Sequence, residues 1–590
     1  MMFARLALLA FSCALLFACS GAADRIAEEP TPAEAPPAPV AISEPEPAPE
    51  RHFPDDSLYD LLVAEFALRR RAYDVALDAY QKQAPQLRDA GVSAHTTRLS
   101  QFLQQEEAAL DAALLWVELE PTNLEALNVA AALLVNDGQP VAALSHLATI
   151  ESLGGAANFP MVLSDFDNLD SATREALAQQ VEALHSRFEG SVRLNLTLAL
   201  LATEQQDYEL ALQRLETTLA LEPGLHEALL VEARILTVMG DSNPYARIQQ
   251  TLKQNPDDKL LRLQFARLLA ATDMEGARDQ FEVLAKQEPN DPDILYSLAL
   301  ISRELGELDA ATNYLQQLIA TGQRTNEAYY YLGRIEEQNA QPERALEAYR
   351  QVGNSREFIA ANSRIGNILI ERDDLQESRD WFADLRIRYP ARLIDLYGLE
   401  SETLTQYGYI DDAKELVDEA LAIAPESSAL LYNRAMLSEK QGDLDAMEKD
   451  LRTIIDSDPD NATALNALGY TLTNRTDRHE EALQLITKAL ALQPNEPAIL
   501  DSMGWVLFRT GRYEEALDYL SRAYEEFPDP EVAAHLGEVL WVIGDRDMAR
   551  TIWLDAAALN PDHPVLSETL RRFGLDMSGA GIDSTTPQQP

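Results

Sequence analysis

The sequence predicts an all-α fold, a solenoid of repeated helical hairpins, and two observations support this prediction. Proline recurs at spacings of 33 to 35 residues through much of the C-terminal two thirds of the chain. A small residue lies twelve positions before most of these prolines. Such a period is typical of two-helix units that bury their apolar sides only by stacking on neighbours. We expect roughly 11 to 13 units wound into a right-handed superhelix.

The first element, residues 1–18, has the pattern of a secretory signal peptide. Arg5 supplies the positive charge, and residues 6–17 supply an apolar stretch. This stretch is too short to span a bilayer as a mature helix. We therefore expect the segment to be removed during export.

The signal peptide ends in a motif that predicts a lipid anchor. Leu16-Phe17-Ala18-Cys19 resembles the lipobox of bacterial lipoproteins. The resemblance implies cleavage before Cys19, a diacylglycerol on its thiol and acylation of the new amino end, so that acyl chains hold the protein on a membrane. Ser20 stands where inner-membrane retention usually shows Asp, which favours the outer membrane, facing the periplasm. Cys13 is the alternative acceptor, and an ordinary signal peptide is the alternative interpretation.

Composition and charge narrow the function further. Residues 19–52, rich in Pro, Ala and Glu, predict a disordered, extended tether, and residues 573–590 predict a disordered tail. The net charge of −49 opposes binding to nucleic acid. The chain has two cysteines, Cys13 and Cys19, so we expect neither a disulfide nor a cysteine-based metal site or nucleophile in the mature protein.

Three sets of positions define the repeat. The prolines are Pro223, Pro256, Pro289, Pro390, Pro425, Pro459, Pro494, Pro528 and Pro561, with proline missing near Gln323 and Glu357. The small residues are Ala211, Ala277, Ala311, Ala345, Ser378, Ala413, Ala482, Ala516 and Ala549. About twelve residues before the small residues lies a pair of a large apolar residue and Gly. These pairs are Leu332-Gly333, Ile365-Gly366, Leu468-Gly469, Met503-Gly504 and Leu536-Gly537. This arrangement resembles the tetratricopeptide repeat (TPR) family, whose paired helices recur about every 34 residues.

The spacing also predicts how each unit packs. The Gly lets the first helix approach the second closely, and a large residue four after the small one fills the space, as at Phe281, Tyr349, Phe382 and Trp553. We expect helix stops at Gly306, Gly408, Gly442, Gly511 and Gly544.

The pattern divides the folded body into three parts. Residues 53–153 predict degenerate N-terminal repeats, residues 191–572 the main array, and residues 154–190 an irregular helical insertion between them. The insertion breaks the phase with Gly154-Gly155 and then a helix that starts near Asp170-Ser171.

No catalytic motif appears in the sequence. His226-Glu227 and His479-Glu480 each lack the second His, four residues after the first, that completes a zinc-peptidase helix. Phosphate-binding loops and serine-nucleophile motifs are also missing. We expect a non-enzyme without metal or cofactor.

Binding of proteins is the function that the repeats favour. In the TPR family the fifth, ninth and twelfth positions of each unit face a groove, and the resemblance places aromatic and polar residues there. These groove candidates are Tyr296, Arg303, Tyr330, Arg334, Tyr432, Asn466, Tyr470, Trp505, Phe508, His535 and Trp541. Aromatic and Arg side chains are the residue types that dominate protein interfaces.

Lipobox, tether and repeat array together resemble a particular group of outer-membrane TPR lipoproteins, the LbcA-like adaptors of a periplasmic carboxyl-terminal processing serine protease. The resemblance implies that the front helices dock the protease while the array holds peptidoglycan cross-link hydrolases for degradation. On this chain the protease-docking candidates are Leu58, Leu61, Leu62 and Phe66. Two alternatives remain: an assembly factor for outer-membrane proteins, pili or exopolysaccharide export, and an activator of a peptidoglycan synthase.

Overall fold

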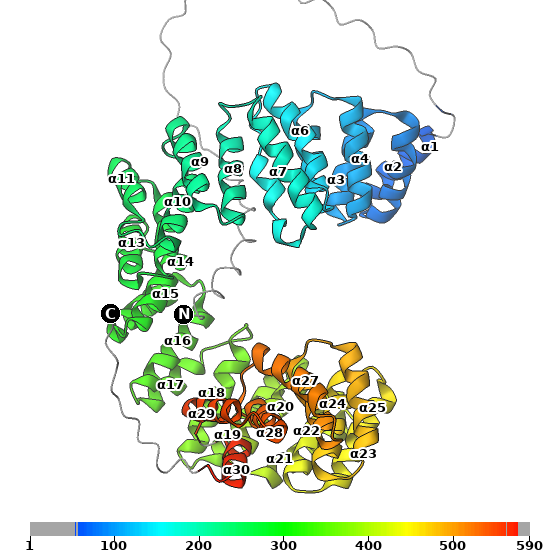
Figure 1. Cartoon of the computed structure of the whole chain (residues 1–590), viewed down its shortest axis with the longest axis vertical. Coiled ribbons are helices and arrows are strands. Elements are labelled where there is room, and N and C mark those ends of the chain that lie inside the picture. Colours follow the sequence, from blue (N-terminus) through cyan, green and yellow to red (C-terminus); the bar gives the residue numbers. More distant parts are fainter. Residues whose placement is uncertain (1–53, 55–56, 562, 576–590) are drawn as a thin grey trace, which may run out of the picture. The chain divides into compact units, whose positions relative to one another are not determined.

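The computed structural model describes residues 54, 57–561 and 563–575, and its regular elements over these ranges are helices (Figure 1). The predicted signal peptide, Cys19 and the tether up to residue 52 lie outside the described residues, as does the tail from residue 576. The chain divides into two compact units, Met1–Pro289 and Asn290–Pro590, which are treated separately below.

The first unit contains thirteen α-helices and two short 3₁₀ helices in its described part. They are α1 (Ser57–Arg69), α2 (Tyr73–Leu87), α3 (Ala90–Phe102), α4 (Glu106–Leu119), α5 (Leu124–Asn136), α6 (Pro140–Ser152), η1 (Phe159–Leu163), η2 (Phe166–Asn168), α7 (Ser171–His185), α8 (Val192–Glu204), α9 (Tyr208–Leu221), α10 (His226–Val238), α11 (Ala246–Gln254), α12 (Lys259–Leu269) and α13 (Met274–Gln287).

The second unit continues the same architecture. Its elements are α14 (Pro292–Glu304), α15 (Leu308–Thr321), α16 (Thr325–Gln338), α17 (Pro342–Tyr349), α18 (Phe358–Glu371), α19 (Leu375–Arg388), η3 (Pro390–Arg392), α20 (Leu393–Gln406), α21 (Ile410–Ile423), α22 (Ser428–Lys440), α23 (Leu444–Ser457), α24 (Ala462–Arg475), α25 (His479–Leu492), α26 (Pro497–Arg509), α27 (Tyr513–Glu526), α28 (Pro530–Ile543), α29 (Arg546–Leu559) and α30 (Pro564–Arg572).

Consecutive helices pack as pairs, here called helix A and helix B. All the described α-helices except α7 and α30 belong to such a pair, which gives fourteen pairs, slightly more than the predicted number. The pair α3/α4 was not recognised as a separate unit in the sequence. The all-α fold of stacked helical hairpins is confirmed.

The turns between helices A and B follow from their residues. The predicted helix stops are confirmed, because Gly306, Gly408, Gly442, Gly511 and Gly544 all have positive φ. At one such turn Gly442 has a φ of 78°, which only glycine adopts without strain. Asp443 then caps the next helix, since its carboxylate accepts a hydrogen bond from the Ala446 backbone N–H at 3.1 Å.

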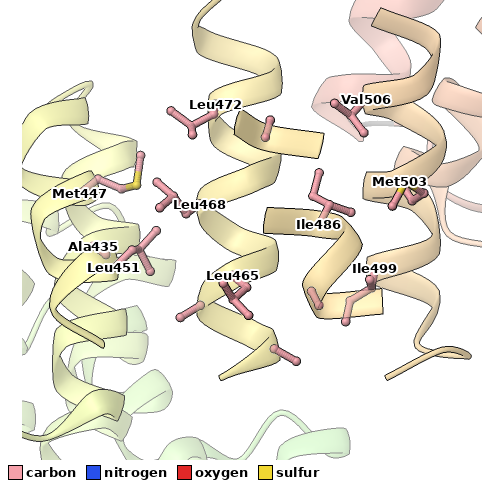
Figure 2. Close-up of a cluster of buried hydrophobic side chains, with 14 of the residues drawn as sticks. Ala435, Met447, Leu451, Leu465, Leu468, Leu472, Ile486, Ile499, Met503 and Val506 are labelled. Carbon is pink, nitrogen blue, oxygen red and sulfur yellow. The ribbon is translucent and has the colours of Figure 1, made fainter. Parts of the chain in front are cut away.

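The predicted close approach of helix A to helix B is also confirmed. A Cβ added at Gly333 would lie 2.5 Å from the Tyr349 ring, and one added at Gly366 would lie 2.8 Å from the Phe382 ring. Further along the second unit the buried side chains are mainly aliphatic, as Figure 2 shows for Leu468 of α24 and Ile486 of α25. The core therefore runs from pair to pair.

Residues 154–190 form an integral part of the first unit. The two 3₁₀ helices bury Phe159, Val162 and Phe166, and α7 buries Leu177 and Val181, all in the core that α5, α6 and α8 share. The segment's apolar side chains therefore pack within the unit, in the core that α5, α6 and α8 share.

The folded body extends beyond the Arg572 boundary drawn from the sequence. Phe573 packs with ring centroids 5.4 Å from Trp541 and 5.0 Å from Trp553. The described chain ends two residues later, at Leu575.

Candidate protein-binding surfaces

The described residues show no arrangement suited to metal catalysis. No group of three or more His, Cys, Asp or Glu side chains in this part of the chain is placed to hold a metal ion. His226 instead bonds to Asp258 at 2.8 Å, between neighbouring repeats. A search of the same residues also finds no helix long and apolar enough to cross a membrane.

Three groove candidates lie together at the start of the second unit. Tyr296 of α14 and Tyr330 of α16 both contact Tyr331, with ring centroids 5.8 Å and 5.3 Å apart. Arg303 lies over Tyr331 at 4.9 Å, and Arg324 lies over Tyr296 at 3.9 Å. We call these five residues the tyrosine–arginine cluster. Their side chains are half-buried, and guanidinium groups stacked on rings keep little freedom to lose when a partner binds.

Arg334 extends this surface into solvent. Its guanidinium is exposed and donates to the Tyr330 hydroxyl at 3.4 Å. Burial raises the pKa of Tyr296, so this hydroxyl stays protonated at neutral pH and can act as a donor. The surface thus combines apolar area with directional hydrogen bonding, as protein interfaces do.

Tyr432 and Asn466 are half-buried on the A helices α22 and α24. The Asn466 side-chain amide donates to the Ala498 carbonyl at 3.5 Å, which links it to the next repeat. Both residues are therefore only partly available to a partner.

Trp505 and His535 do not lie on a binding surface, and this corrects the prediction. Both are buried, and their rings stack at 4.0 Å between centroids. Trp505 donates to the Asn474 side chain at 2.6 Å, while His535 bonds through Nδ1 to Asp501 at 2.9 Å. Trp505 is covered because helices A of successive repeats contact one another here. His535 lies two residues before Gly537, which makes it the sixth position of its unit and not one of the groove positions.

His535 is also a buried ionisable group. Burial alone would lower the pKa of His535, but the charge and hydrogen bond of Asp501, with the charges of Glu531 and Glu538, raise it above its ordinary value. Tyr470, another groove candidate, hydrogen-bonds Glu531 two repeats along the chain and is half-buried. His535 therefore links α28 to α26 through its bond to Asp501.

Phe508 and Trp541 remain partly accessible. Phe508 stacks on Trp505 at 5.1 Å, lies 5.7 Å from the Tyr513 ring and is half-buried. The guanidinium groups of Arg546 and Arg550 lie over the Trp541 ring, 5.1 Å and 5.4 Å from its centroid. These residues retain the properties of a binding surface.

The protease-docking candidates on α1 fall into two groups. Leu58, Leu62 and Phe66 recur every four residues, so they share one helix face, and they are 59, 48 and 58% exposed. Leu61 differs from them, since it is half-buried and packs against the hydrophobic cluster that includes Ala64 and Leu77. The structure adds Tyr59, which is more exposed than any of the three.

Stacked helical hairpins of this kind, with Gly at the helix contact, define a tetratricopeptide repeat protein. TPR family models match residues 303–357, 428–461, 460–526 and 502–564. The chain belongs to the TPR family, whose repeats bind other proteins, and it is therefore a protein-interaction scaffold.

Similarity to a bacterial protein over most of both sequences also supports the family assignment. The TPR repeat-containing protein PA4667 of Pseudomonas aeruginosa is 38% identical over 514 residues, which cover 86% of this chain and 87% of that protein. Cellulose synthase operon protein C of Pseudomonas fluorescens is 25% identical over 335 residues, covering 47% of this chain and 26% of that protein. Among solved structures, Naa15/Naa10 bound to HypK-THB aligns over 90% of this chain and 98% of its own at 13% identity and a TM-score of 0.41.

Proposed function

We propose that this protein is a lipid-anchored, non-catalytic adaptor that faces the periplasm from the outer membrane. It brings peptidoglycan cross-link hydrolases to a carboxyl-terminal processing serine protease. Such an adaptor raises the effective concentration of enzyme and substrate for each other without chemistry of its own. The lipobox at Cys19 supports the anchor, and the likeness to a Pseudomonas TPR protein over most of both chains supports a bacterial scaffold.

The observation that carries the proposal is the difference between the two ends of the array. A solenoid needs a polar outer face on its terminal elements to remain soluble. At the C-terminal end, α30 meets this need, since it buries Leu566 and Leu570 and leaves Arg571 exposed. At the N-terminal end of the described residues, α1 instead leaves the apolar side chains of Leu58, Leu62 and Phe66 exposed. An apolar face left open on a terminal helix is suited to a partner protein.

The charge of the chain supports the second part of the proposal. Enzymes that bind an anionic wall polymer carry basic surfaces, and a scaffold of net charge −49 attracts them. The two kinds of partner would then bind separate regions, one at α1 and the other along the repeats.

The test compares two double variants of the full chain. Leu58→Asp/Phe66→Asp alters the α1 face, while Leu260→Asp/Ile423→Asp alters two apolar residues of nearly equal exposure, 58 and 59%, elsewhere. Tagged proteins are recovered from envelope extracts, and the bound proteins are identified by mass spectrometry.

We expect the wild type and the control variant to recover both the protease and at least one cross-link hydrolase. The α1 variant should lose the protease and keep the hydrolase. Recovery of neither enzyme by the wild type would refute the adaptor function.

The likeness to cellulose synthase operon protein C favours a second function, that of an assembly factor in exopolysaccharide export. The same purification decides this, because that function predicts recovery of export components without protease or hydrolase. Recovery of pilus or outer-membrane assembly components would indicate an assembly factor for those structures. Recovery of a peptidoglycan synthase would indicate an activator of that enzyme.

A further inference from the structure

The repeat formed by α16 to α19 differs from its neighbours in the second unit. Helix α17 has eight residues, and eight more, 350–357, connect it to α18, whereas four connect α21 to α22. The connection ends at Glu357, one of the two places where the proline period lacks a proline. The Asn326 side chain accepts a hydrogen bond from the Gly353 backbone N–H at 2.8 Å, which holds the connection on the repeat.

An arginine–tryptophan contact joins this connection to the end of α19. Trp381 is half-buried, with Arg350 at 5.3 Å and Arg388 at 5.0 Å from its ring centroid. The indole N–H donates to the buried side chain of Asn362 at 2.9 Å, which fixes the ring. Glu377 and Asp384 each pair with one of these arginines at 2.8 Å. The two guanidinium groups are therefore held in place by their neighbours.

Two further arginines, Arg356 and Arg392, lie in the connection before α18 and just after α19. Arg392 donates to Asn354 of the connection at 2.7 Å and lies 5.2 Å from the Phe358 ring centroid. Arg356 is exposed within the connection itself. Within the described ranges, no carboxylate lies within 4.0 Å of Arg356 or Arg392. Their hydrogen-bonding edges remain available to a ligand.

The local charge differs from that of the whole chain. Residues 344–392 contain nine arginines against eight acidic residues, a net charge of +1 in a protein of net charge −49. Guanidinium groups pair with carboxylates in a bidentate geometry that lysine lacks, and this segment has no lysine. The segment around Trp381 is thus slightly basic, whereas the chain as a whole is strongly acidic.

We infer that Arg350, Arg356, Trp381, Arg388 and Arg392 form a recognition site for an acidic polypeptide segment of a partner protein. Carboxylates of the segment bind the free edges of Arg356 and Arg392, and an apolar side chain packs beside Trp381. Ile387 favours a polypeptide over a phosphate polymer, because this 80% exposed apolar side chain lies on the same turn of α19. The site is independent of the α1 face and of the protease.

The test measures binding of fluorescein-labelled (Glu-Glu-Leu)₄ to the full-length chain by fluorescence anisotropy. Arg356→Gln/Arg392→Gln removes the two arginines of the site that pair with no carboxylate among the described residues. The matched control is Arg509→Gln/Arg522→Gln, which removes two exposed arginines elsewhere and the same total charge. We expect the first variant to bind about tenfold more weakly, and the control less than twofold more weakly, than the wild type. Added salt should weaken wild-type binding.

Three results would overturn the inference. They are no binding of the peptide to the wild type, equal weakening by both double variants, or tighter binding of inorganic polyphosphate than of the peptide. A Trp381→Phe variant adds a readout of the apolar contact, since it should weaken binding of (Glu-Glu-Leu)₄ more than binding of an all-Glu peptide.

Discussion

Replacing Gly333 by alanine tests the close approach of helices A and B that defines the repeat. The added methyl group would lie 2.5, 2.6 and 2.7 Å from three atoms of the Tyr349 ring. This ring is fully buried and also packs against Tyr330, with 6.0 Å between the ring centroids. The contact can be relieved only by moving the ring or separating α16 from α17.

The expected cost follows from two opposing effects. Overpacking a core costs about 1–3 kcal/mol, whereas alanine favours a helix over glycine by about 1 kcal/mol. Because three ring atoms are in contact, we take the upper part of the overpacking range, about 2–3 kcal/mol, which leaves a net loss of about 1–2 kcal/mol in local stability. Hydrogen exchange of the α16 and α17 amides should therefore accelerate roughly 5- to 30-fold. Distant pairs should be unaffected because each pair contacts only its neighbours.

Two comparisons make this result decisive. Gly398 lies in α20 with no atom within 4 Å of an added Cβ, so Gly398→Ala should slow local exchange instead. In a Tyr349→Ala background the clash is absent, and Gly333→Ala should then stabilise α16. If Gly333→Ala and Gly398→Ala changed exchange in the same direction, the packing argument would be refuted.

Three further predictions concern charge and anchoring. The pKa of His535 is raised in the folded state, so its contribution to stability is fully present below about pH 6.5 and is lost as the pH rises through the raised value. The urea midpoint should therefore fall between about pH 6 and about pH 9 in the wild type, and less in His535→Gln. Asp450 is buried and accepts hydrogen bonds from Arg434 at 2.7 and 2.8 Å, so Asp450→Asn should cost about 2 kcal/mol in urea unfolding. Asp418 is the exposed partner of the same arginine, so Asp418→Asn should lower the free energy of unfolding by less than about 0.5 kcal/mol. Cys19→Ser should move the protein from the membrane to the soluble fraction and remove acyl mass in mass spectrometry; unchanged membrane association would refute the lipid anchor.

The sequence predicted the repeat well because its period is imposed by packing. Only Gly fits where helix A touches a large side chain, as at Gly333, and only a small residue fits opposite it, so both recur with the helix pair. The pair α3/α4 was overlooked although Ala109 lies twelve residues before Pro121, at the spacing used elsewhere. One small residue without its Gly partner was too weak a signal.

The candidate surfaces were harder to predict because exposure depends on how neighbouring helices pack. The ninth position of the repeat places Arg334 at an exposed surface but Trp505 under the next helix A. The α1 face was anticipated apart from Leu61, whose spacing to Ala64 and Leu68 puts it on the core side. The arginines around Trp381 come together through an irregular connection, which no regular period describes.

The open face of α1 has a thermodynamic consequence for the whole N-terminal end. In an array stabilised by nearest neighbours, the outermost pair has one interface fewer than any internal pair and opens first. A protein that binds α1 supplies a further interface, so it should raise the stability of α1 and α2 by RT ln(1 + L/Kd), where L is the free concentration of that protein. No helix precedes α1 in the part of the chain that the structure describes, so the bound partner would take the place of a terminal repeat there.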